Sequence, residues 1–148
     1  MYFEDFEPGQ RFTTASKTIT QDEIIAFAGE WDKQSFHLDP VAAENSIYGG
    51  LIASGFHTLL ISFNLIVEAA IWTESSQGSP GMENVRWLAP VRPGDVLTVQ
   101  FEVVSKRLSS TRADRGYVLW DHVTRNQSGT DVLSFRSTGI NLLRGQIG

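Results

Sequence analysis

The chain has 148 residues and a formal net charge of −5, with 41% hydrophobic and 20% charged residues. A chain of this length is expected to form a single domain, residues 1–148, around one buried core. The negative charge argues against general nucleic-acid binding. The absence of cysteine excludes disulfides, a catalytic thiol and cysteine-ligated metal centres.

The location and the longest apolar segment can also be judged from composition. The first residues lack the basic and apolar regions of a secretory signal, so a cytoplasmic location is the default expectation. The longest apolar run, residues 56–72, contains His57, Asn64 and Glu68. It is therefore predicted to be a helix buried in a soluble domain and not a membrane span. Three scattered histidines give no indication of a metal site.

The first part of the chain predicts one strand and one amphipathic helix. Residues 11–18 are expected to be extended, because they follow a Pro-Gly turn. Thr20 and Glu23 then have the spacing of a capping box, which marks the start of a helix. Apolar residues follow at positions i, i+3, i+4 and i+7 of one helical face: Ile24, Phe27, Ala28 and Trp31. We expect this helix to end near Trp31.

A loop, a short helix and a long helix are expected next. Residues 32–37 are predicted to form a loop. Asp39 and Pro40 are the residue types favoured at an N-cap and at the first position of a helix. A pair of glycines ends this short helix. The long helix, residues 55–72, carries apolar residues on most of its faces, so we expect protein to surround it on all sides.

The second half of the chain predicts antiparallel strands. The expected strands are residues 82–88, 96–104, 117–124 and 132–143. Turn residues lie at 93–95 and 126–129, and residues 105–116 are predicted to be a polar connection. Helices followed by strands, with one helix wrapped on all sides, predict an α+β fold in which an antiparallel sheet folds around a central helix.

Two segments bring together the residue types of an acid–base site. The first has Asp32 and His37 five residues apart. The second, residues 43–57, is rich in small residues and leads through Ser54 and Gly55 into the predicted long helix. A carboxylate and an imidazole facing a helix N-terminus suit proton transfer beside a carbonyl group.

These segments resemble the MaoC-like dehydratase and (R)-specific enoyl-CoA hydratase family, which has the hotdog fold. The family motif Asp-x-Asn-Pro-x-His stands here over residues 32–37, with Gln34 and Ser35 in place of Asn and Pro. Residues 48–55 and 87–95 also resemble the family. Gln carries the same amide one methylene further out, and the loss of Pro removes a fixed φ angle.

The resemblance implies a hydro-lyase that acts on acyl-CoA thioesters. Asp32 and His37 would hold one water, which adds to a trans-2-enoyl thioester to give an (R)-3-hydroxyacyl thioester. The backbone N–H of Gly55 would bind the thioester oxygen, aided by the partial positive charge of the helix N-terminus. Ser54 and Gln34 would hydrogen-bond within the site.

The resemblance also bears on cofactors and partners. It implies no metal and no redox cofactor, because coenzyme A enters only as part of the substrate. It implies a homodimer or a higher homo-oligomer, with both protomers forming each acyl channel, and neither nucleic acid nor membrane as a partner. The exposed edge of a sheet independently favours pairing. Chain length and branching of the acyl group are not readable from the sequence.

Other interpretations stay open for these residues. Taken alone, Asp32 fits a loop cap and His37 fits a partly buried structural histidine. The same fold hosts thioesterases, which typically place an acidic residue on or near the central helix. The only acidic residue there, Glu68, lies late in that helix. A non-catalytic acyl-thioester-binding protein is the third interpretation, and the departures at Gln34 and Ser35 are its main support.

Several further polar residues have ordinary structural interpretations. His57 is expected in the core or in a pocket wall, and His122, within a predicted strand, is expected to be structural. The four tryptophans are expected in the core or at an interface. A basic group in the polar connection either meets the phosphates of coenzyme A or is simply solvated, which is the commoner role: Lys106, Arg107, Arg112 and Arg115.

Overall fold

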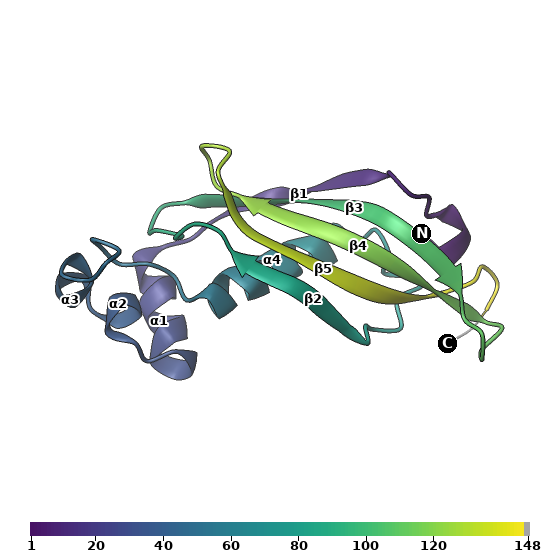
Figure 1. The fold of residues 1–148 in the computed structure, drawn as a ribbon, viewed down its shortest axis with the longest axis horizontal. Helices are drawn as coiled ribbons and strands as arrows, with labels where there is room; N and C mark the ends of the chain where they lie inside the picture. Colours follow the sequence, from purple (N-terminus) through teal and green to yellow (C-terminus); the bar gives the residue numbers. More distant parts are fainter. Residues whose placement is uncertain (147–148) are drawn as a thin grey trace.

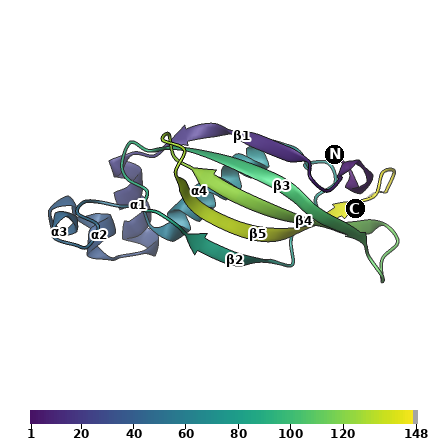
Figure 2. The same ribbon diagram turned by 45° about the horizontal axis from the view of Figure 1, so that its top comes forward.

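The computed structural model describes residues 1–146 as a curved antiparallel sheet lying on one central helix, with three shorter helices at one end (Figures 1 and 2). The helices are α1 (Gln21–Trp31), α2 (Ser35–Leu38), α3 (Pro40–Glu44) and α4 (Gly55–Glu68), after a 3₁₀ turn at Phe3–Asp5. The strands are β1 (Arg11–Thr18), β2 (Gly81–Trp87), β3 (Val96–Leu108), β4 (Arg115–Arg125) and β5 (Asp131–Leu142). The sheet folded around a helix confirms the predicted α+β architecture.

The five strands follow the order β1-β3-β4-β5-β2, and every neighbouring pair is antiparallel. Alternate residues of β3 and β4 are buried, as expected for strands with one face toward a core. The inner face carries an aromatic cluster, in which Trp120 contacts Phe6, Phe101 and Trp72. Trp72 follows the end of α4, so the cluster packs this end of the helix segment against the sheet.

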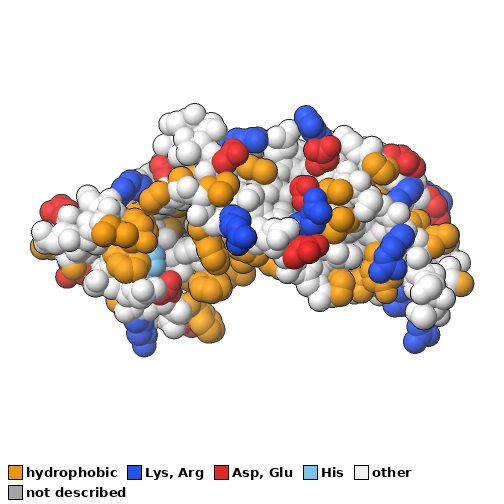
Figure 3. Space-filling view, in the orientation of Figure 1, with side chains coloured by type: hydrophobic (Ala, Val, Ile, Leu, Met, Phe, Trp, Pro, Cys, Tyr) orange, Lys and Arg blue, Asp and Glu red, His pale blue; other side chains and the backbone are white. Residues whose placement is uncertain are grey.

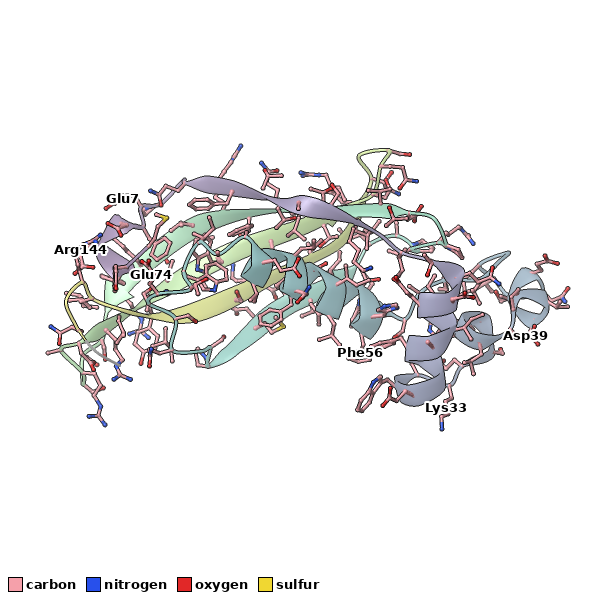
Figure 4. All side chains as sticks on the ribbon, turned by 180° about the vertical axis from the view of Figure 1, so that it is seen from behind. Glu7, Lys33, Asp39, Phe56, Glu74 and Arg144 are labelled. Carbon is pink, nitrogen blue, oxygen red and sulfur yellow. The ribbon has the colours of Figure 1, made fainter. Side chains whose placement is uncertain are left out.

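Helix α4 packs one side against the sheet and leaves the other side uncovered. Ser62 on its inner side hydrogen-bonds Thr124 of β4, with 2.7 Å between the two hydroxyl oxygens. Figure 4 shows that no other element within residues 1–146 covers the outer side, near the labelled Phe56. Four apolar side chains of α4 are between 44% and 60% exposed: Phe56, Leu60, Phe63 and Val67. The expectation that protein surrounds this helix is therefore wrong for the chain by itself.

Capping residues define where helices α1 and α3 begin. Thr20 caps α1 by accepting a hydrogen bond from the backbone N–H of Glu23 at 3.2 Å. Asp39 caps α3 in the same way, accepting from Val41 and Ala42. The predicted end of α1 is correct. Trp31, however, is 70% exposed and does not share the buried face of the helix.

Two predictions for the helical segments differ from the structure. The long helix ends at Glu68 and not at residue 72, because Ala70 takes a left-handed conformation with φ of 58°. Residues 35–38 form a single helical turn and not a loop. The turn is closed by a hydrogen bond from the Asp39 N–H to the Ser35 carbonyl at 2.9 Å.

Among residues 1–146, no helix is long and apolar enough to cross a membrane.

Half of the predicted polar connection over residues 105–116 is strand. Strand β3 continues to Leu108, and β4 begins at Arg115. Lys106 and Arg107 belong to β3 and pair with residues of β4. The Arg107 guanidinium lies 4.3 Å from the centre of the Tyr117 ring. The charged residues reflect the exposed end of a long hairpin, because the strands extend beyond the core there.

Candidate active site

Asp32 lies just after α1, where its carboxylate is held by two neighbouring side chains. Ser54 donates a hydrogen bond to Oδ2 at 2.7 Å, and the Gln34 amide donates one to Oδ1 at 2.8 Å. Burial raises the pKa of Asp32, but these hydrogen bonds and the nearby His37 outweigh burial, so the pKa lies below its ordinary value. The carboxylate is therefore ionised at neutral pH.

His37 lies in the single turn of α2 and directs its two ring nitrogens to different partners. Nδ1 lies 2.7 Å from the carbonyl oxygen of Ile52, and Nε2 lies 3.3 Å from Oδ2 of Asp32. A carbonyl oxygen only accepts hydrogen bonds, so Nδ1 carries a proton. Nε2 is then the nitrogen that faces the carboxylate. The structure thus brings the two predicted residues together as a pair.

Asp32 and His37 line a cavity of about 420 Å³ between the short helices, the start of α4 and the end of β2. Its other walls are mostly apolar, from Phe36 and Tyr48 on one side to Trp87 and Val132 on another. Figure 3 shows hydrophobic side chains gathered where the helical end meets the sheet. A mostly apolar cavity with a few convergent polar groups is the usual form of a small-molecule site.

The N-terminus of α4 opens into the same cavity. Gly55 is the first residue of α4 and lines the cavity, and Ser54 is its N-cap. The first amides of a helix have no carbonyl partner within the helix and carry a partial positive charge. The hydroxyl of Ser54 donates to Asp32 and makes no capping bond. All five predicted site residues therefore lie in one region, with Ser54 acting on the carboxylate.

Other candidates lie apart from this cavity. Glu68 lies at the far end of α4 and accepts a hydrogen bond from Asn64 at 2.9 Å. Figure 1 shows the β3–β4 connection at the end of the sheet opposite α1, α2 and α3. Lys106 there is 2.9 Å from Glu7, and Arg115 is 2.6 Å from Asp114. Two of the four basic residues, Lys106 and Arg115, are therefore engaged in ion pairs, at the end of the sheet far from the acid–base pair.

The two remaining histidines have distinct surroundings. His57 stacks on Phe27 with 4.5 Å between ring centres, and burial lowers its pKa. His122 is 2% exposed on the inner face of β4, where burial lowers its pKa to about 4. It borders a second cavity of about 350 Å³ under the far half of α4. The burial of His57 agrees with the predicted core or pocket-wall position, and the burial of His122 within β4 agrees with its predicted structural role.

Two contributors to the site were missed by sequence reasoning. The Ile52 carbonyl orients His37, but a backbone carbonyl carries no signature of residue type. Trp87 was expected in the core or at an interface, yet it lines the cavity and presses on Gly55. The sequence feature that could have pointed to Trp87 is its position at the start of residues 87–95, the second segment that resembles the family.

The fold and this pair of residues define a hotdog protein with an acid–base cavity, and comparison with known proteins agrees. The MaoC like domain family matches residues 5–120. The uncharacterized protein YdeM of Bacillus subtilis is 36% identical over 107 residues, covering 72% of this chain and 76% of YdeM. The chain therefore belongs to the MaoC-like dehydratase family.

Solved structures support the same assignment. A MaoC-like dehydratase from Rhodospirillum rubrum superposes with a TM-score of 0.92 at 36% identity, covering 99% of both chains. The R-hydratase PhaJ1 from Pseudomonas aeruginosa superposes with a TM-score of 0.71 at 25% identity, covering 95% of this chain and 84% of that one. The hotdog fold is thus shared over almost the whole length.

Proposed function

We propose that residues 1–148 form a single MaoC-like domain that hydrates trans-2-enoyl thioesters of coenzyme A and dehydrates the (R)-3-hydroxyacyl products. The observation that carries this proposal is the pairing of Asp32 Oδ2 with His37 Nε2 at 3.3 Å beside the N-terminus of α4. Similarity to a MaoC-like dehydratase and to an (R)-hydratase adds support.

In the proposed reaction, the Asp32–His37 pair positions one water, accepts a proton from it and donates a proton to the substrate. The water oxygen bonds to the β-carbon, and one water proton passes to the Asp32–His37 pair. The pair returns a proton to the α-carbon on the same face, so one molecule of water is added overall. The two groups act as a coupled unit, and separate acid and base roles are not assigned. Ser54 and Gln34 keep the carboxylate ionised and oriented.

The thioester oxygen gains negative charge as water adds, because the electrons of the double bond move toward the carbonyl. In the proposed complex, the Gly55 N–H donates a hydrogen bond to this oxygen. The partial positive charge of the α4 N-terminus adds to the stabilisation. This chemistry uses no metal or redox cofactor. The cytoplasmic location stays a prediction.

We further propose that a second copy of the chain covers the outer face of α4. The exposed apolar stripe of this helix extends from Phe56, beside the catalytic cavity, to Val67, beside the second cavity. Contiguous apolar surface of this kind typically marks an interface. A dimer is expected in sedimentation analysis, and Leu60→Glu with Phe63→Glu should yield monomers. A wild-type monomer at micromolar concentration would contradict this proposal.

The function is tested by following loss of enoyl absorbance with crotonyl-CoA and longer trans-2-enoyl-CoAs. We expect hydration by the wild type and a loss of about 10²–10⁴-fold in His37→Ala with the fold retained. A parallel assay for free CoA thiol with saturated acyl-CoA should remain at background. Thiol release would indicate a thioesterase. Tight acyl-CoA binding without turnover, unchanged in His37→Ala, would indicate a binding protein. Either result would overturn the hydratase proposal.

A further inference from the structure

Trp87, the last residue of β2, packs its indole ring directly against Gly55 at the start of α4. A Cβ atom at residue 55 would lie 2.8 Å from Cδ1 of Trp87 and nearer still to Nε1. No side chain larger than hydrogen therefore fits while the indole keeps this position. The close approach places an indole N–H beside the first amide of the helix.

The position of the ring is defined by the protein around it. Phe56, the next residue of α4, contacts the ring edge-on, with 5.7 Å between ring centres. The neighbouring Leu88 N–H donates to the Val132 carbonyl at 2.9 Å, which anchors the end of β2 to β5. The indole thus packs on the first residues of α4 from the anchored end of β2, and Trp87 remains 48% exposed.

Two N–H donors in this corner have no acceptor among residues 1–146: the amide of Gly55 and the indole of Trp87. Both residues line the cavity that contains Asp32 and His37. An indole nitrogen only donates hydrogen bonds, so its complement in a ligand is an acceptor. A thioester carbonyl oxygen has two lone pairs and can accept from two donors at once.

We propose that the indole N–H of Trp87 and the amide N–H of Gly55 together bind the thioester carbonyl oxygen of the substrate. This inference rests on the proposed hydratase function and adds Trp87 as a catalytic residue. The carbonyl oxygen gains negative charge as water adds, so two donors fixed in advance stabilise the transition state more than the ground state. The role of Trp87 therefore falls mainly on kcat.

The first test replaces the donor and keeps an aromatic ring. Trp87→Phe should lower kcat for crotonyl-CoA hydration about 10–100-fold, with KM changed less than about threefold, because one of two donors is lost. Trp31→Phe makes the same chemical change at an exposed tryptophan that does not line the cavity, and kcat should be unchanged. Replacement of Trp87 by β-(3-benzothienyl)alanine, which has sulfur in place of the N–H, should reproduce the loss without altering the packing.

The second test measures the carbonyl bond directly, without turnover. Crotonyl-CoA with a ¹³C-labelled thioester carbonyl is bound to Asp32→Asn and to Asp32→Asn combined with Trp87→Phe. Hydrogen bonds weaken the carbonyl bond, so its infrared stretch should move to higher frequency when the indole donor is removed. An unchanged frequency, or a rise in KM with kcat retained, would show that Trp87 only shapes the cavity and would overturn this inference. A wild type that hydrates no enoyl-CoA would overturn the proposed function, and this inference with it.

Discussion

The helical end of the molecule and the middle of the sheet bury a histidine to a similar extent and surround it differently. His37 is 4% exposed and His122 is 2% exposed. His37 has a carboxylate at 3.3 Å and a backbone carbonyl at 2.7 Å. His122 has only the Ser137 hydroxyl, at 2.8 Å from Nε2, and its Nδ1 has no partner among the described residues.

The difference shows that burial alone does not make a proton-transfer site. His122 is sandwiched by two rings, with 4.3 Å between its centre and that of Phe135 and 5.9 Å to that of Phe101. Burial there disfavours the imidazolium form, and the nearby Asp121 only partly offsets it. His37, by contrast, has the ionised carboxylate of Asp32 within 3.3 Å of Nε2, and a negative charge there favours a proton on that nitrogen.

The largest effect is expected when His37 loses its carboxylate. Asp32→Asn keeps the shape of the side chain and removes its charge. The polar neighbours of His37 would then all be neutral, like the Ser137 hydroxyl that contacts His122. The rate of crotonyl-CoA hydration should fall about 10²–10⁴-fold. Initial rates and thermal unfolding are measured together, and Asp121→Asn on the outer face of the sheet is the matched control. Equal rates for Asp32→Asn and the wild type would contradict the assigned pair.

A second effect concerns the contribution of His122 to the pH dependence of protein stability. The pKa of this histidine is 6.5 as its ordinary value and about 4 in the folded protein. Between these values the unfolded chain binds more protons, so stability is complete above pH 6.5 and declines as the pH falls toward 4. From pH 7 to pH 5, His122 should contribute a loss of about 2 kcal/mol in the free energy of unfolding.

This contribution is measured by urea unfolding at both pH values. His122→Phe with Ser137→Ala replaces the imidazole by a ring that fits the aromatic stack and leaves no hydroxyl without a partner. The double variant should lose less stability on acidification than the wild type, by the amount that His122 contributes. An identical pH dependence in the two proteins would show that the imidazole is not held neutral in the sheet.

A smaller effect is expected when the carboxylate loses one of its hydrogen bonds. Ser54→Ala removes the donor at 2.7 Å from Asp32 Oδ2, so the pKa of Asp32 should rise toward its ordinary value. Hydration should then be lost at a higher pH on the acidic side of the profile, with a rate at pH 7 lowered about tenfold or less. The pH dependence of kcat/KM is the measurement. Ser16→Ala, which removes an exposed hydroxyl on β1, should leave the profile unchanged.

Several features that depend on local sequence were predicted correctly, although the helical turn at residues 35–38 was not. The bounds of β1 follow from turn residues and the start of α1 from the Thr20 cap, which act within a few positions. The end of α4 was not predictable in this way, because residues 69–72 suit a helix. There Trp72 contacts Phe101 and Trp120 in the core, and the chain turns at Ala70 to reach them.

The same distinction holds for the candidate site. Asp32 and His37 were identified because their spacing is a property of one short segment. The contact between Trp87 and Gly55 joins residues 32 positions apart, and no local pattern specifies it. The uncovered face of α4 is a further case. The apolar sequence pattern of a helix is the same whether its own chain or a second copy covers it.

The smallest effect is expected at Gln34, where the chain departs from the family motif. Its amide donates to Asp32 Oδ1 at 2.8 Å, but the side chain is exposed, so water competes for the same oxygen. Gln34→Ala should therefore raise the pKa of Asp32 less than Ser54→Ala does, and lower hydration at pH 7 by about threefold or less. The comparison uses pH profiles of the two variants recorded side by side. A larger shift in Gln34→Ala than in Ser54→Ala would show that the exposed amide, and not the buried hydroxyl, controls the charge of Asp32.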